Sequence, residues 1–170
     1  DPKGHLCFST ALAASARFGG EVPGLALWQE EQIPRCRGMG SSATACVAGF
    51  LAWCWLNDRY PSTEEALDFV AAQEGHPDNA VAAMLGGLTI AGQAASGLKV
   101  VRGRWPARLR IALCSPEIEI STADARASLR RELPLEDAVY TGSRLGLLLG
   151  GLFTDDEEAI AAGLSDRLHE

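Results

Sequence analysis

Apolar residues recur at spacings of three and four along much of this chain, which is typical of helices that bury one face. Residues typical of helix ends mark where several of these helices begin or stop. Gly19 follows the first such stretch, and Ser62 with Glu65 forms the capping-box pattern of a helix start. Residues 42–56 and 145–153 are so apolar that we expect buried helices there. The predicted helices are residues 6–17, 42–56, 62–74, 78–85, 122–131, 135–153 and 155–168.

Shorter stretches have a strand-like pattern. They lie at residues 24–32, 88–91, 98–102 and 109–114. Strands and helices are mixed without regular β–α alternation, so their order favours an α+β fold over a doubly wound parallel sheet. Pro106 and the glycines near it indicate a boundary, from which we expect a first lobe at residues 1–105 and a second at residues 106–170.

Composition limits the classes of partner. The chain has 170 residues, of which 47% are hydrophobic, so it can bury a core. Its net charge of −7 argues against a nucleic-acid surface, which would show clustered lysine and arginine. The longest apolar run is too short to cross a bilayer. The charged residues Asp1 and Lys3 are not typical of a signal peptide. We therefore expect neither nucleic acid nor a membrane as partner.

The cysteines indicate the compartment. There are five, an odd number, and they lack the spacing of zinc sites. They are typical of reduced thiols, so we expect a cytoplasmic protein. Cys46 and Cys54 lie on one predicted helical face and are expected in the core. Cys36 lies beside a predicted helix start, where the pKa of a thiol can be lowered, although loop position alone does not show exposure.

The most informative stretch is residues 33–44, with the sequence IPRCRGMGSSAT. Gly38 and Gly40 allow positive φ and a close approach of the backbone to a ligand. Ser41 and Ser42 begin a predicted helix, where unpaired N–H groups and the helix dipole attract anions. The pattern predicts a phosphate site that differs from the Walker P-loop. The alternative interpretation is an ordinary glycine–serine helix cap.

Further segments decide between these interpretations. Residues 74–79 read EGHPDN, and residues 120–126 read ISTADAR. Together with residues 33–44, they resemble the GHMP kinase superfamily and, within it, the homoserine kinases. Met39 stands where the phosphate loop of that family usually has leucine. A weaker match lies at residues 166–170, and all the matches follow the order of the family.

The resemblance implies a GHMP kinase fold, with a ribosomal-S5-like first lobe and a ferredoxin-like second lobe. Homoserine kinases are longer, because they begin with a strand-rich segment and end with a glycine motif, and neither pattern is present here. The chain is thus similar to the central portion of the family, and both lobes are expected to be partial. We expect this chain alone to have little or no kinase activity.

The resemblance also implies a reaction, the ATP-dependent phosphorylation of L-homoserine in threonine biosynthesis. Mg2+ would be held by Ser42 and Glu74. Asp78 would be the catalytic residue, either as a base or by orienting the acceptor, whereas His76 is expected to be structural. The residues implied to bind ATP are Pro34, Arg35, Cys36, Arg37, Gly38, Met39, Gly40, Ser41, Ser42, Ala43 and Thr44. The residues implied to bind homoserine are Asp78, Asn79, Thr122 and Arg126.

Plainer interpretations exist for these residues. Asp78 or Asn79 can cap a helix, Thr122 can do the same beside a surface Arg126, and Glu74 can be a surface carboxylate. For the whole chain, one alternative is a non-catalytic nucleotide-binding module. Another is a GHMP kinase that acts on a mevalonate-like or sugar substrate. The oligomeric state stays open, with a homodimer as one option.

Overall fold

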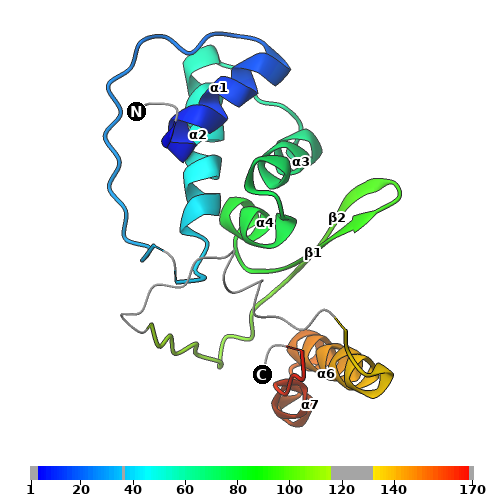
Figure 1. Cartoon of the computed structure of the whole chain (residues 1–170). Helices are drawn as coiled ribbons and strands as arrows, with labels where there is room; N and C mark the ends of the chain where they lie inside the picture. Colours follow the sequence, from blue (N-terminus) through cyan, green and yellow to red (C-terminus); the bar gives the residue numbers. More distant parts are fainter. Residues whose placement is uncertain (1–3, 36, 116–131, 169–170) are drawn as a thin grey trace. The chain divides into compact units, whose positions relative to one another are not determined.

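The structure of this chain, a computed structural model, describes residues 4–35, 37–115 and 132–168. These residues form helices and a two-stranded sheet, in agreement with the predicted α+β class (Figure 1). The elements are α1 (Leu6–Phe18), α2 (Ser41–Asn57), α3 (Thr63–Glu74), α4 (Pro77–Leu85), β1 (Leu88–Ala94), β2 (Gly97–Gly103), α6 (Leu135–Thr154) and α7 (Glu157–Gly163). The chain divides into two compact units, residues 1–102 and 103–170.

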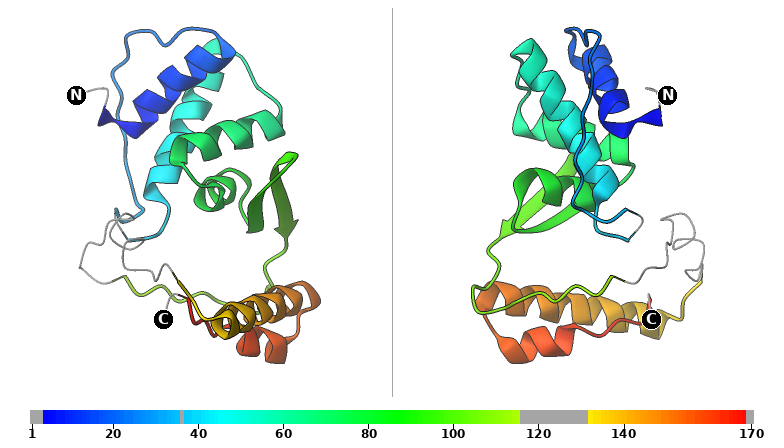
Figure 2. Two further views of the ribbon diagram at one scale, coloured as in Figure 1. Left: turned by 45° about the vertical axis from the view of Figure 1, so that its right-hand side comes forward. Right: turned by 90° about the vertical axis from the view of Figure 1, so that its left-hand side faces the viewer.

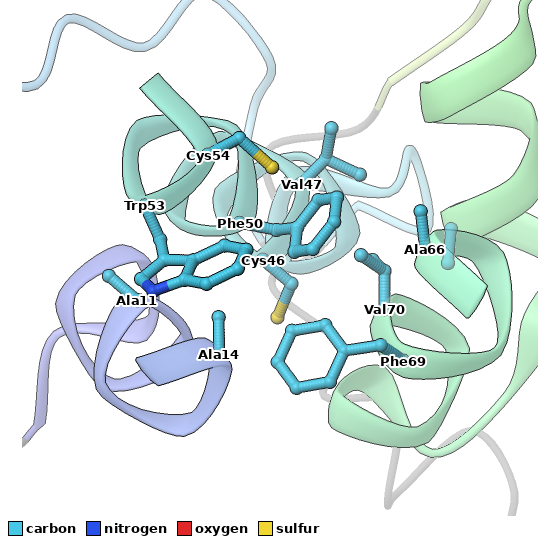
Figure 3. Packing of buried hydrophobic residues seen from close by; sticks show 11 residues of the cluster. Ala11, Ala14, Cys46, Val47, Phe50, Trp53, Cys54, Ala66, Phe69 and Val70 are labelled. Atoms are coloured by element: carbon cyan, nitrogen blue, oxygen red, sulfur yellow. The ribbon is translucent and has the colours of Figure 1, made fainter. Parts of the chain in front are cut away.

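The core of the first unit is an aromatic cluster between α1, α2 and α3. Phe50, Trp53 and Phe69 are buried in it (Figure 3). Phe18, the last residue of α1, packs against them with its ring centroid 5.4 Å from Phe69 and 5.5 Å from Trp53. The Trp53 indole N–H donates to the Gly19 carbonyl over 3.1 Å, so the ring is packed and also hydrogen-bonded. This cluster fixes the two helices, α2 and α3, whose ends meet at the site described below.

α1 and α2 lie side by side at very short distance (Figure 2). A Cβ placed on Gly49 would lie only 2.0 Å from the Cys7 carbonyl oxygen, so glycine is required at this crossing. Cys7, Cys46 and Cys54 are free thiols, and all are buried, as the sequence predicts for the last two. Burial raises the pKa of each of these thiols, which makes them packing residues rather than nucleophiles.

The sequence predicts buried helices at residues 42–56 and 145–153, and this prediction is wrong for part of the surface of each helix. One face of α2 packs on the core, but Leu51 and Trp55 are 52% and 79% exposed. In α6, Leu145 is 54% exposed. Each helix packs against the neighbours in its own unit along one side. Apolar composition alone therefore overestimates how much of a helix is buried.

Among the predicted strands, those in the middle of the chain form and the others do not. β1 and β2 pair through a tight turn, in which Gly97 has a φ of 104°. Residues 24–32 and 109–114, by contrast, are not strands in the described structure. A strand needs a neighbour to complete its ladder of hydrogen bonds, and the described part of the chain gives these segments none.

The second unit contains α6 and α7, which pack against each other. The helix predicted at residues 155–168 is shorter than expected. Asp155 has a φ of 63° and ends α6, and the side chain of Asp156 then caps α7. The helix predicted at residues 122–131 lies outside the described residues. None of the helices in the described part of the chain is long and apolar enough to span a membrane.

Candidate functional site

Glycines shape the backbone that leads into α2. Gly38 and Gly40 have φ values of 69° and 76°, in the left-handed region that favours glycine. Gly40 is the N-cap of α2 and supplies no side-chain hydrogen bond to the first N–H groups of the helix. Gly38 and Ser42 are exposed, and Gly40 and Ser41 are half-buried. The start of α2 can therefore be reached by an anion.

Ser42 connects the start of α2 to the end of α3. Its Oγ donates a hydrogen bond to Glu74 Oε1 over 2.5 Å. The other carboxylate oxygen, Glu74 Oε2, lies 3.8 Å from the Sγ of Cys46, one helical turn after Ser42. The side chain of Glu74 is only 8% exposed. The carboxylate is consequently held through both oxygens by one face of α2.

Local signals bring Glu74 to this place. At the start of α3, Ser62 Oγ accepts from the Glu65 N–H, and the Glu65 carboxylate accepts from the Ser62 N–H. At the other end, Gly75 has a φ of 88° and ends the helix directly after Glu74. The predicted helix is thus confirmed from its capping box to its last residue. The glycine then turns the chain into α4.

His76 lies between two carboxylates. Its Nδ1 is 2.6 Å from Asp78 Oδ1, and its Nε2 is 3.8 Å from Glu74 Oε1. His76 is also the N-cap of α4, and Pro77 occupies the first helical position. Asp78 therefore belongs to the first turn of α4 and does not cap it. These contacts agree with the structural role that the sequence predicts for His76. They also connect Glu74, a predicted metal ligand, with Asp78, a predicted substrate-binding residue.

Opposing effects act on the pKa of Asp78. Partial burial raises this pKa, but the hydrogen bonds from the Asn79 N–H, at 2.8 Å, and from His76 outweigh the burial. The pKa of Asp78 is therefore held below its ordinary value. The carboxylate is ionised at neutral pH and is a weak proton acceptor.

The start of α4 lies against the glycine loop. A Cβ placed on Gly40 would lie 3.4 Å from the side-chain atoms of Asn79. Residues 33–44 and 74–79, which the resemblance assigns to one site, thus come together in the first unit. The proximity that the resemblance requires is present. The role of each residue stays a prediction.

Glu31 also belongs to this region, although no motif in the sequence indicates it. Its Oε1 accepts a hydrogen bond from Ser41 Oγ, and its Oε2 accepts one from Arg35 Nε over 2.6 Å. The bond from Ser41, followed by that from Arg35, lowers the pKa of Glu31. In the sequence, Glu31 stands beside Glu30 within a predicted strand, and no pattern distinguishes the two.

The remaining predicted site residues occupy varied environments. Outside the described residues lie Cys36, Thr122 and Arg126. Among the other loop residues, Pro34 and Arg35 are exposed, and Arg37 and Met39 are half-buried. In α2, Ala43 is buried, and Thr44 Oγ1 donates to the Gly40 carbonyl over 3.0 Å. Both residues lie in the first turn of α2, and their contact with ATP stays a prediction.

The side chains present fit a magnesium nucleotide. Left-handed glycines before an exposed helix start suit phosphate oxygens. Mg2+ prefers oxygen ligands and keeps several waters, so the Ser42 hydroxyl and the Glu74 carboxylate are sufficient on the protein side. Within the residues that the structure describes, no group of three or more His, Cys, Asp or Glu side chains could hold a metal.

Comparison with known proteins identifies relatives. A family model described as the GHMP kinases N terminal domain matches residues 5–87. The homoserine kinase of Parasynechococcus marenigrum (strain WH8102) is 42% identical over 139 residues, which make up 81% of this chain and 44% of that protein. The homoserine kinase of Prochlorococcus marinus (strain MIT 9303) is 40% identical over 167 residues, covering 98% of this chain and 53% of that protein.

A solved structure has the same fold. The crystal structure of homoserine kinase from Cytophaga hutchinsonii matches with a TM-score of 0.80 and 24% identity, covering 100% of this chain and 55% of that chain. The expected partial GHMP kinase fold is therefore confirmed. This chain spans about half the length of the curated relatives that it matches.

Proposed function

We propose that this chain, which belongs to the GHMP kinase superfamily, serves the ATP-dependent phosphorylation of L-homoserine to O-phospho-L-homoserine, a step of threonine biosynthesis. The observation that carries the proposal is the hydrogen bond between Ser42 and Glu74, because it joins the glycine loop to the EGHPDN segment. The relatives named homoserine kinase support the choice of acceptor.

Residues 34–44 are proposed to bind the phosphates of ATP. The backbone N–H groups of Gly40, Ser41 and Ser42 would donate to phosphate oxygens at the positive end of the helix dipole. The left-handed conformation of Gly40 supports this proposal, because the backbone there takes a positive φ that a residue with a side chain would adopt only under strain.

Ser42 and Glu74 are proposed to hold Mg2+, which when bound neutralises charge on the transferring phosphoryl group. A serine hydroxyl that donates its proton to Glu74 still has lone pairs to offer a cation. The contact from Cys46 steadies the second oxygen of Glu74. The protein therefore presents a preorganised pair of oxygens and needs little rearrangement to bind the ion.

Asp78 and Asn79 are proposed to bind the amine and hydroxyl of homoserine. Because its pKa is held low, we propose that Asp78 orients the acceptor hydroxyl rather than acting as a strong base. Phosphoryl transfer depends mainly on positioning and charge, so a strong base is not required. His76 would keep the Asp78 carboxylate in place. Thr122 and Arg126 are proposed, from the resemblance, to bind the substrate carboxylate.

We also propose that residues 1–105 form the ATP-binding lobe of such a kinase and residues 106–170 the beginning of its second lobe. The division of the structure after residue 102 supports this arrangement. The free thiols in the described part of the chain support a reducing, cytoplasmic environment.

A transfer assay tests the proposed reaction. The purified chain is incubated with Mg2+, ATP labelled on its γ-phosphate, and homoserine, mevalonate or galactose as acceptor. Because we expect slow turnover from this chain, the labelled product is detected directly. Label should enter homoserine in preference to the other acceptors, and Glu74→Gln should abolish the transfer. Glu64→Gln, an exposed change on the same helix, is the matched control.

Two results would contradict the proposal. Preference for another acceptor would indicate a different GHMP kinase. Absence of transfer to every acceptor, together with ATP binding that Glu74→Gln leaves unchanged, would favour the non-catalytic nucleotide-binding module.

A further inference from the structure

We infer that Glu31 is a positioning residue that closes the base of the phosphate loop and so prepares it for nucleotide. The inference rests on the proposed role of residues 34–44 in binding ATP. Glu31 precedes this loop, and Ser41 begins the helix that follows it. A bond between their side chains therefore connects the two ends of the loop.

Both oxygens of the Glu31 carboxylate are engaged. Oε1 accepts from the Ser41 hydroxyl, and Oε2 accepts from Arg35 Nε over 2.6 Å. The side chain of Glu31 is 17% exposed, whereas that of Arg35 is 73% exposed. The mostly buried carboxylate of Glu31 thus contacts Arg35, which lies inside the loop, and Ser41, which lies where the loop meets α2.

The glycines of the loop make such a restraint useful. Gly38 and Gly40 give the backbone more conformational freedom than other residues would, and fixing that freedom on binding costs entropy. A connection across the base of the loop removes part of this freedom before the ligand arrives. Ligand binding then orders fewer groups, and the affinity increases.

A carboxylate near a phosphate site can also act in the opposite way, as a competitor for the same donors. The contacts of Glu31 argue against this role. Its bond goes to the hydroxyl of Ser41 and does not use a backbone N–H group at the start of α2. Its charge is balanced by the guanidinium of Arg35. Positioning and competition predict opposite effects when Glu31 is removed.

The first experiment measures ATP affinity by isothermal titration calorimetry in the presence of Mg2+. Glu31→Ala should weaken ATP binding by about five- to tenfold, since both contacts are lost. Glu31→Gln keeps an oxygen for Ser41 but loses the ion pair with Arg35, so its affinity should be intermediate. Glu30→Ala makes the same charge change at the adjacent exposed position and should leave the affinity unchanged.

The second experiment needs no nucleotide. Hydrogen exchange followed by mass spectrometry should show faster exchange of amides in residues 34–43 for Glu31→Ala, and no change for Glu30→Ala. Unchanged exchange in Glu31→Ala, or tighter ATP binding by that variant, would overturn the inference. If the wild-type chain binds no ATP while Glu31→Ala still loosens the loop, the proposed function fails and the positioning role stands.

Discussion

Ser42 at the start of α2 and Glu74 at the end of α3 share a hydrogen bond of 2.5 Å, although they lie 32 positions apart in the chain. A hydroxyl that donates to a carboxylate makes a charge-assisted bond, which is stronger than a neutral one. Through it, the last part of the phosphate loop lies against the first residue of the EGHPDN segment. The side chains of the two proposed metal ligands are thus in direct contact with each other.

This contact predicts coupled effects of substitution. Ser42→Ala and Glu74→Gln should each weaken Mg2+-dependent ATP binding by about tenfold or more. The double variant should be little worse than the more damaging single change, because both residues act through one ion. Calorimetric titration with ATP at limiting Mg2+, for the wild type, the two single variants and the double variant, measures how far the two effects are coupled. Fully additive losses would show that the residues act independently.

The contact between His76 and Asp78 predicts that the pKa of Asp78 depends on this histidine. His76→Ala removes a hydrogen bond and a nearby positive charge that both lower the pKa of Asp78, so this pKa should rise towards its ordinary value. The bond from the Asn79 N–H should keep part of the depression. Carbon NMR of the Asp78 carboxyl group during a pH titration measures the change. His5→Ala is the control, and an unchanged or lower Asp78 pKa in His76→Ala would contradict this contact.

Asp78 should also contribute to the pH dependence of stability. Its folded pKa is depressed, so its contribution is present above the unfolded pKa of about 3.9 and is lost as the pH falls through the folded value. Between neutral pH and strong acid, the free energy of unfolding should therefore decrease less in Asp78→Asn than in the wild type. Urea unfolding at several pH values measures this difference. Equal decreases would contradict the prediction.

Replacing a glycine by alanine should change the free energy of unfolding in opposite directions in α2 and in α6. Gly49→Ala would place a Cβ against the backbone of Cys7 and should destabilise the first unit by about 1–3 kcal/mol or more. Gly146→Ala in α6 meets no atom within 4 Å and should stabilise the second unit by about 0.5–1 kcal/mol. Urea unfolding of each variant tests the pair, and a tolerated Gly49→Ala would contradict the close crossing of α1 and α2.

The helices of the site were predictable because their signals are local. The capping box at Ser62 and the stop at Gly75 fix α3, and the left-handed Gly40 begins α2. The contact between Ser42 and Glu74 could be expected only from the family resemblance, because no periodic pattern joins residues so far apart. The residues predicted to bind the substrate carboxylate, Thr122 and Arg126, lie outside the described residues.

Features that depend on a neighbouring segment could not be predicted. Residues 24–32 have a strand-like pattern, yet no ladder forms there, since pairing needs a partner strand. Trp55 is apolar but exposed, because in the described part of the chain the opposite face of α2 is the one that packs against other helices. Glu31 has the same residue type and the same local pattern as Glu30. Only the folded loop brings Ser41 and Arg35 to it.

The central claim is that the glycine loop and the EGHPDN segment form one metal–nucleotide site. Its most direct test uses Mn2+ in place of Mg2+, because both ions prefer oxygen ligands and Mn2+ broadens nearby NMR signals. With ATP present, the amide signals of Ser42 and Glu74 should broaden most in the wild-type chain, and this broadening should disappear in Glu74→Gln. Strongest broadening at α6 or α7, or equal broadening in Glu74→Gln, would contradict the claim.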